Sequence, residues 1–117
     1  MLKGLISRLK SSKPSQLRVP DGQRLYRCLA HGENFPGAIL SRTEAIGFYT
    51  TRFVVAKDAQ TAEMLVLEML RAEPGLQLPE GVDKPMDARV SFERIEEVPN
   101  DTPPQPNAGF TFYVMGT

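Results

Sequence analysis

Two side chains capable of chemistry lie close together in the segment at residues 24–31. Cys28 and His31 form a Cys-x-x-His sequence, and each is the single residue of its type. A zinc site needs about four thiolate or imidazole ligands, which one cysteine and one histidine cannot supply. Positions three apart in a regular strand also face opposite sides, which separates a Cys–His nucleophile pair. The sequence therefore predicts no metal site and no catalytic residue, with Cys28 as a small buried apolar side chain.

A second group of polar side chains surrounds a long connection expected at residues 32–47. Long connections inside a compact domain are often functional, and the planar guanidinium of Arg52 in the adjoining strand could hold a carboxylate or phosphate. A ligand site under this connection would be formed by Arg52, Glu33, His31, Arg42 and Tyr49. We favour the simpler alternative that Arg52 pairs with Glu93 or Glu97 on a neighbouring strand. In that case Arg52→Ala would change stability by about 1 kcal/mol or less.

Other motifs with a known chemistry are missing from the sequence. The acidic residues of segment 93–101 lack the regular Asp spacing of a calcium loop, and glycines are scattered singly, without a phosphate-binding loop. An RNA-recognition sheet needs basic and aromatic residues on its third strand, whereas residues 88–98 turn acidic. The sequence therefore predicts no cofactor and disfavours nucleic acid as a partner.

Length and composition describe one small domain. The 117 residues are 41% hydrophobic and 24% charged, which is typical of a single globular domain. No apolar run is long enough to cross a membrane, and cations interrupt the N-terminal apolar stretch, which argues against a signal peptide. Together with the single cysteine, these features favour a cytoplasmic location.

The zero net charge hides an uneven distribution along the chain. Residues 1–57 carry ten Lys and Arg against three Asp and Glu, a net +7, and residues 58–117 carry a net −7. One explanation is a basic N-terminal arm that recruits nucleic acid or an anionic membrane. We favour the other explanation, in which strands from both halves interleave in one sheet and their charges neutralise locally.

Residues 1–22 are expected to form an amphipathic helix and a tether in front of a single α+β domain at residues 23–117. Four apolar residues at helical spacing predict a short amphipathic helix over residues 1–10: Leu2, Leu5, Ile6 and Leu9. Ser, Pro and Gly predominate in the tether. A helix this short is marginal alone, so we expect it to pack on its own domain or on a second subunit rather than on a membrane.

The remaining pattern predicts four strands and one main helix. Strands are expected at residues 24–31, 48–56, 88–97 and 110–115, with a bulge where the alternation breaks at Arg94. The main helix follows the N-cap Asp58 and ends at Pro74. Its core-facing stripe is Ala62, Leu65, Val66 and Met69. Met64 and Leu67 lie outside this stripe, which predicts a second apolar partner for the helix.

The order of these elements predicts a four-stranded mixed sheet with ferredoxin-like layering. Residues 48–56 are apolar on both faces, as in a central strand. The segment from 48 to 97 is expected to form a right-handed strand-helix-strand crossover. Each outer strand would join its sequence neighbour as a hairpin with a long loop.

Several blocks of the sequence resemble a set of small bacterial proteins with no assigned function. The blocks are GENF at residues 32–35, IGFYTTRFVVA at 46–56, IEEV at 95–98 and GFTFYV at 109–114. The resemblance covers roughly residues 24–115. It implies a small α+β cytoplasmic protein and carries over no catalytic residue.

The apolar excess of the helix and strands favours a non-enzymatic binding or protein-interaction module that self-associates as a homodimer. The first alternative is a small-anion-binding or enzymatic domain with a pocket under the connection at residues 32–47. The second is the basic N-terminal arm that recruits nucleic acid or membrane.

Overall fold

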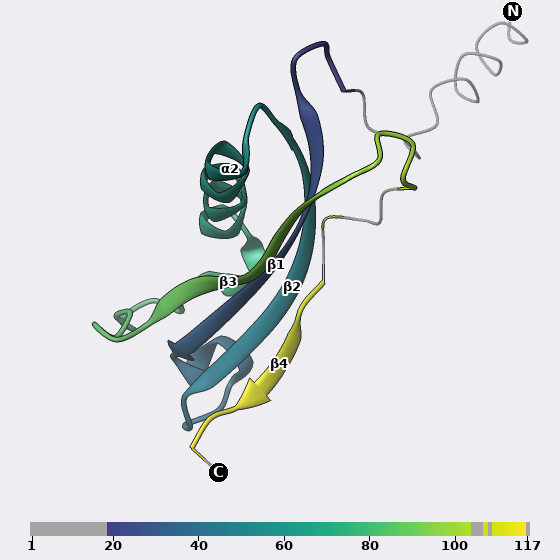
Figure 1. The fold of residues 1–117 in the computed structure, drawn as a ribbon. Coiled ribbons are helices and arrows are strands. Elements are labelled where there is room, and N and C mark those ends of the chain that lie inside the picture. Colours follow the sequence, from purple (N-terminus) through teal and green to yellow (C-terminus); the bar gives the residue numbers. More distant parts are fainter. Residues whose placement is uncertain (1–18, 104–106, 108, 117) are drawn as a thin grey trace, which may run out of the picture.

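The computed structural model describes residues 19–103, 107 and 109–116. The elements follow in the order β1 (Arg24–Phe35), η1 (Gly37–Leu40), β2 (Ile46–Ala56), α2 (Ala59–Arg71), η2 (Pro74–Leu76), β3 (Arg89–Val98) and β4 (Thr111–Val114), where η marks a 3-10 turn. They form a small single α+β domain (Figure 1). The helix expected at residues 1–10 lies outside the described residues, as does the tether up to residue 18.

The four strands form one sheet in the order β3-β1-β2-β4, and every neighbouring pair is antiparallel. The expected mixed sheet with ferredoxin-like layering is therefore wrong. β2 and β3 run in the same direction on either side of α2 in the chain, but β1 lies between them, so no parallel pairing forms. The expected hairpin of the last two strands is also wrong, because β4 pairs with β2 at the edge opposite β3.

The position of β1 explains the first correction. Its residues Cys28 and Ala30 are fully buried, as in an interior strand, while Arg27 and His31 alternate with them. Apolar alternation indicates which face a residue occupies but not which strand lies beside it. The first strand was expected to be an outer strand of the sheet, whereas in the structure it lies between β2 and β3.

α2 covers one face of the sheet, called here the helix face. Ala62, Val66 and Leu70 are buried against strand residues that include Cys28 and Val54. The predicted stripe is thus confirmed, with Leu65 and Met69 partly buried against the same cluster, and it extends by one residue to Leu70. Asp58 caps the helix as expected, since its carboxylate accepts a hydrogen bond of 2.8 Å from the Thr61 amide.

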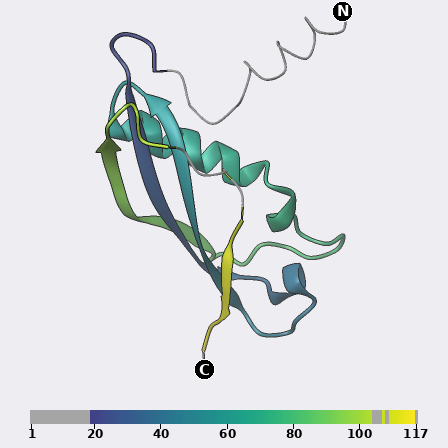
Figure 2. The same cartoon turned by 90° about the vertical axis from the view of Figure 1, so that its right-hand side faces the viewer.

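The opposite face, called here the open face, is covered by no helix of the described residues (Figures 1 and 2). In Figure 2 the sheet is seen from this side, with α2 passing behind the strands. Even η1 and η2 pack on the helix face, through Ile39 and Leu76. A small second cluster of Leu25, Phe53 and Val98 lies at one end of the open face. Most of this face therefore remains accessible in the described part of the chain.

A side chain protects the edge of β2 beyond the short strand β4. The Asn107 side-chain oxygen accepts a hydrogen bond of 2.7 Å from the Phe53 amide. Its side-chain nitrogen donates one of 2.8 Å to the Phe53 carbonyl. The Asn107 amide thus stands in for a strand partner, which shields an edge that could otherwise pair with another chain.

The burial of Cys28 predicts that the free energy of unfolding falls at alkaline pH. Burial raises the pKa of the Cys28 thiol from 9.0 to about 11, and the charge of Glu63 acts in the same direction. The unfolded chain ionises first, so this contribution is present below pH 9.0 and is lost as the pH rises to about 11. In urea titrations the difference in unfolding free energy between wild type and Cys28→Ala should shrink across that range. A constant difference would contradict the assignment.

Candidate functional site

Three aromatic rings gather on the open face, each from a different strand. His31 of β1 lies opposite Tyr49 of β2, and Tyr113 comes from β4. The His31 and Tyr49 rings are stacked, with centroids 4.3 Å apart and planes inclined by 6°. The Tyr113 centroid lies 5.9 Å from that of His31 and 5.8 Å from that of Tyr49. Aromatic pairs across strands stabilise a sheet, and these three residues form what we call the aromatic platform.

A chain of polar contacts runs through the aromatic platform. His31 Nε2 lies 2.5 Å from the Tyr113 hydroxyl, and His31 Nδ1 lies 3.5 Å from the Glu93 carboxylate. A proton on Nδ1 would face the carboxylate, which leaves Nε2 to accept the hydrogen bond from the hydroxyl. The imidazole is therefore held from both sides, and its side chain is only 12% exposed.

Glu93 lies beside the aromatic platform because β3 contains a bulge. Leu29 of β1 lies opposite Arg94. The next residue, Ala30, lies opposite Phe92, so Glu93 is the extra residue of β3. Bulges commonly re-aim a side chain next to a site. The bulge predicted from the broken alternation is confirmed, one residue from its expected place.

Tyr113 can lie close to the sheet because its partner has no side chain. Gly47 is opposite Tyr113 in the β2–β4 pairing, and a Cβ atom at Gly47 would overlap the Tyr113 ring. An aromatic ring over a strand glycine also covers exposed backbone. The connection expected at residues 32–47 would have ended at Gly47, whereas in the structure Gly47 lies inside β2 under the Tyr113 ring.

The surroundings of Tyr113 keep its hydroxyl protonated. Burial raises the pKa of Tyr113, and the charges of Tyr49, Glu33 and Glu93 act in the same direction. A phenolate nucleophile needs the opposite shift. The aromatic platform therefore offers a stacking surface and hydrogen-bonding groups rather than an activated nucleophile.

A shallow hollow of about 470 Å³ adjoins Tyr49, which is 37% exposed. Its walls combine apolar side chains with threonine hydroxyls from β2 and the start of β4: Leu29, Tyr49, Thr50, Thr51, Gly109, Phe110 and Thr111. Exposed rings beside small polar groups are typical of contact surfaces between proteins.

The structure places Arg52 in the core on the helix face, where it is 1% exposed. Arg52 Nη1 donates a hydrogen bond of 2.7 Å to the Asn107 carbonyl and lies 3.5 Å from the Glu73 carboxylate. Arg52 Nε donates one of 3.0 Å to the Thr50 hydroxyl. The guanidinium carbon also lies 5.1 Å from the centre of the Phe110 ring. Arg52 thus connects β2 to the end of α2 and to the segment before β4.

The five predicted ligand residues do not converge. His31 and Tyr49 lie together, whereas Arg52 is on the opposite face. Glu33 pairs with Arg89 at 3.5 Å. Arg42 is exposed and pairs with Glu44 at 3.4 Å, rather than with any of the other four residues.

Sequence reasoning missed two residues that contact His31, namely Tyr113 of the aromatic platform and Glu93 beside it. They come from strands far from His31 in the sequence. Period-two alternation places Tyr113 on a face but cannot identify its neighbours. The broken alternation of β3 was a signal for Glu93, but it did not reveal the facing residue.

The described residues contain no group of three or more His, Cys, Asp or Glu placed to hold a metal ion. None of the helices in the same part of the chain is both long enough and apolar enough to traverse a bilayer. Cys28 and His31 lie on opposite faces of β1, as their spacing predicted.

Comparison with known proteins does not assign the chain to a family. No protein-family model, curated protein or solved structure matches it at a significant level. The resemblance of residues 24–115 to small bacterial proteins therefore stays a prediction.

The burial of Arg52 predicts a large effect of Arg52→Ala. Removing one partner of a buried ion pair typically costs about 3–5 kcal/mol, well above the 1 kcal/mol or so expected for a surface pair. Urea denaturation should therefore show a loss of several kcal/mol. Arg42→Ala is the matched control, since its exposed pair should change stability by only about 0.5 kcal/mol. Equal effects of the two substitutions would contradict the burial of Arg52.

The raised pKa of Tyr113 predicts a tyrosine that ionises above the usual range. In a near-ultraviolet absorbance titration of the folded protein, Tyr113→Phe should remove a tyrosine step that lies above the usual range. Tyr26→Phe is the control and should leave that step in place. If the step survives in Tyr113→Phe, the environment assigned to this hydroxyl is incorrect.

Proposed function

We propose that this chain is a non-enzymatic binding module that self-associates through the open face of its sheet. The observation that carries the proposal is the one-sided covering of the sheet within the described residues. α2, η1 and η2 all pack on the helix face, while the open face presents the aromatic platform and the hollow beside Tyr49. Accessible surface of this kind on a sheet commonly marks an interface.

The charges of the open face favour a second copy of the chain as the partner. Six charged residues of this face are balanced, three Arg and three Glu: Arg27, Arg89, Arg94, Glu33, Glu93 and Glu96. Arg27 is joined to Glu96 by hydrogen bonds of 3.0 and 2.7 Å. A two-fold axis brings the same patch of both subunits together, so each subunit could offer Arg to the Glu of the other. The balanced charges of the open face offer no net charge that would attract a strongly charged partner.

The outer surface of α2 is a weaker candidate for the interface. Met64 is 58% exposed there, but its neighbours Gln60, Glu63 and Glu68 are polar. Single exposed apolar residues are normal on protein surfaces. The open face, in contrast, groups aromatic rings from three strands.

The other two hypotheses have less support. The protonated state of the Tyr113 hydroxyl favours binding over nucleophilic catalysis at the aromatic platform. The basic arm that would recruit nucleic acid or membrane belongs to the N-terminal segment at residues 1–22, of which residues 1–18 lie outside the described residues. The free, buried Cys28 thiol is in keeping with the proposed cytoplasmic location.

The oligomeric state of matched variants tests this proposal. Thr51 is exposed at the centre of the open face, so Thr51→Lys would bury a charge only in the dimer. We expect wild type to form a dimer in native mass spectrometry and in analytical ultracentrifugation. Thr51→Lys should raise the dimer dissociation constant about tenfold or more, which corresponds to about 1.4 kcal/mol.

Met64→Lys is the control for added charge, because it places the same group on the exposed side of α2. It should leave the dissociation constant unchanged within about twofold, a small fraction of the tenfold effect. A monomeric wild type at all concentrations would refute self-association. Equal weakening by both substitutions would refute the open face as the interface.

A further inference from the structure

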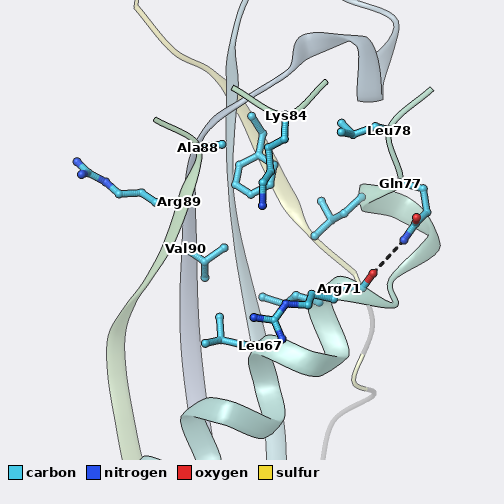
Figure 3. Close-up of a pocket in the computed structure, with 11 residues that line it drawn as sticks. Leu67, Arg71, Gln77, Leu78, Lys84, Ala88, Arg89 and Val90 are labelled. Atoms are coloured by element: carbon cyan, nitrogen blue, oxygen red, sulfur yellow. Dashed lines mark hydrogen bonds between the residues drawn. The ribbon is translucent and has the colours of Figure 1, made fainter. Parts of the chain in front are cut away.

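A cavity of about 540 Å³ lies on the helix face, between the C-terminal half of α2, η2, and the start of β3 (Figure 3). This volume is within the range of small-molecule sites in proteins, about 300–1,000 Å³. The cavity is remote from the aromatic platform, since the sheet separates the two. This cavity is not the pocket expected under the connection at residues 32–47, because none of the five predicted ligand residues lines it; Phe35 at the end of β1 is in its wall.

The walls of the cavity are largely apolar. They contain Leu67 and Leu70 of α2 and Val90 of β3, and four more apolar side chains complete the lining: Phe35, Leu76, Leu78 and Ala88. Leu67 is one of the two helix residues that lay outside the predicted core stripe. A second apolar partner was expected to cover Leu67, whereas in the structure Leu67 lines a cavity.

Hydrogen bonds hold the η2 wall of the cavity against the end of α2. The Gln77 side-chain nitrogen donates to the Arg71 carbonyl and to the Glu73 carbonyl, each at 3.1 Å. These two carbonyls belong to the last turn and exit of the helix, where acceptors lack a partner within the helix. Gln77 therefore fixes the chain that closes one side of the cavity.

Two cationic side chains face each other across the cavity. In Figure 3, Lys84 points into the space from the connection before β3, and Arg71 points into it from α2. Neither forms an ion pair within the described part of the chain. Arg89 points away from the space (Figure 3) and pairs with Glu33. No Asp or Glu is among the lining residues.

We propose that this cavity binds a carboxylate with an unbranched apolar tail. The tail would lie against the apolar walls, where burial of hydrocarbon is favourable. The carboxylate would lie between Lys84 and Arg71, and the Arg71 guanidinium can donate two parallel hydrogen bonds to it. Both ends of such a ligand are matched, one by the apolar lining and the other by the unpaired positive charge.

The positive charge and the apolar walls of the cavity favour this ligand over other occupants. The amphipathic segment at residues 1–10 carries Lys3, Arg8 and Lys10, so it would bring positive charge to a positive site. A small inorganic anion would leave the apolar walls without a partner. The proposal does not rest on self-association, because the cavity and the open face lie on opposite sides of the sheet.

Isothermal titration calorimetry with a matched set of probes tests the proposal. The probes are decanoate below its micellar concentration, decanol, which has the tail without the charge, and acetate, which has the charge without the tail. We expect decanoate to bind at one site per chain. Decanol should bind at least about tenfold more weakly, the weakening expected when a charged hydrogen bond is lost. Acetate should also bind at least about tenfold more weakly, because it lacks the hydrocarbon that the apolar walls would bury.

Variants of the two cationic residues test where in the cavity the carboxylate of decanoate binds. Lys84→Gln and Arg71→Gln should each weaken decanoate binding, and the double variant should weaken it about tenfold or more. Arg89→Gln is the control, since its side chain points away, and it should bind decanoate like wild type. Circular dichroism and the thermal midpoint of each variant establish that it is folded.

Any of three calorimetric results would overturn the proposal. They are the absence of decanoate binding to the folded wild type, equal binding of decanoate and decanol, and unchanged decanoate affinity in the folded double variant. Retention on anionic phospholipid vesicles without binding of free decanoate would also overturn it, because the cations would then serve a membrane surface. None of these results depends on the dimer, whose test uses Thr51 and Met64.

Discussion

The alternation of side chains along β1 is the constraint on which the rest of the structure depends. Cys28 and Ala30 must be buried, so one face of this strand lies under α2, and Arg27 and His31 then have to lie on the other. Because β1 pairs with both β2 and β3, this division extends over the sheet. It explains why one face holds the core and its cavity, while the other presents polar and aromatic groups.

The aromatic platform is a product of pairing rather than of any local sequence. His31 acquires Tyr49 through the β1–β2 register and Tyr113 through the β2–β4 register. The absence of a side chain at Gly47 lets the Tyr113 ring approach the sheet, and the bulge of β3 adds Glu93. Four strands thus contribute to one surface, which is the kind of arrangement that a partner subunit can recognise.

Arg52 illustrates how burial changes the role of a residue. A guanidinium in a strand next to a long connection looks like an anion-binding group, yet here its hydrogen bonds go to Thr50 and to the Asn107 carbonyl. Its ion pair is with Glu73 at the exit of α2. The positive charge available for an anion is instead that of Arg71, in the last turn of α2, and of Lys84, on a segment where only a connection was expected.

The sequence by itself determined the α+β class, the approximate bounds of the strands and the helix, the Asp58 cap and the bulge of β3. These features depend on local periodicity and on the types of neighbouring residues. The strand order, the antiparallel sheet, the burial of Arg52 and the meeting of His31 with Tyr113 were decided only by the tertiary structure. The physical reason is that alternation specifies the face a side chain occupies, whereas neighbours across a sheet are selected by packing between segments distant in the chain.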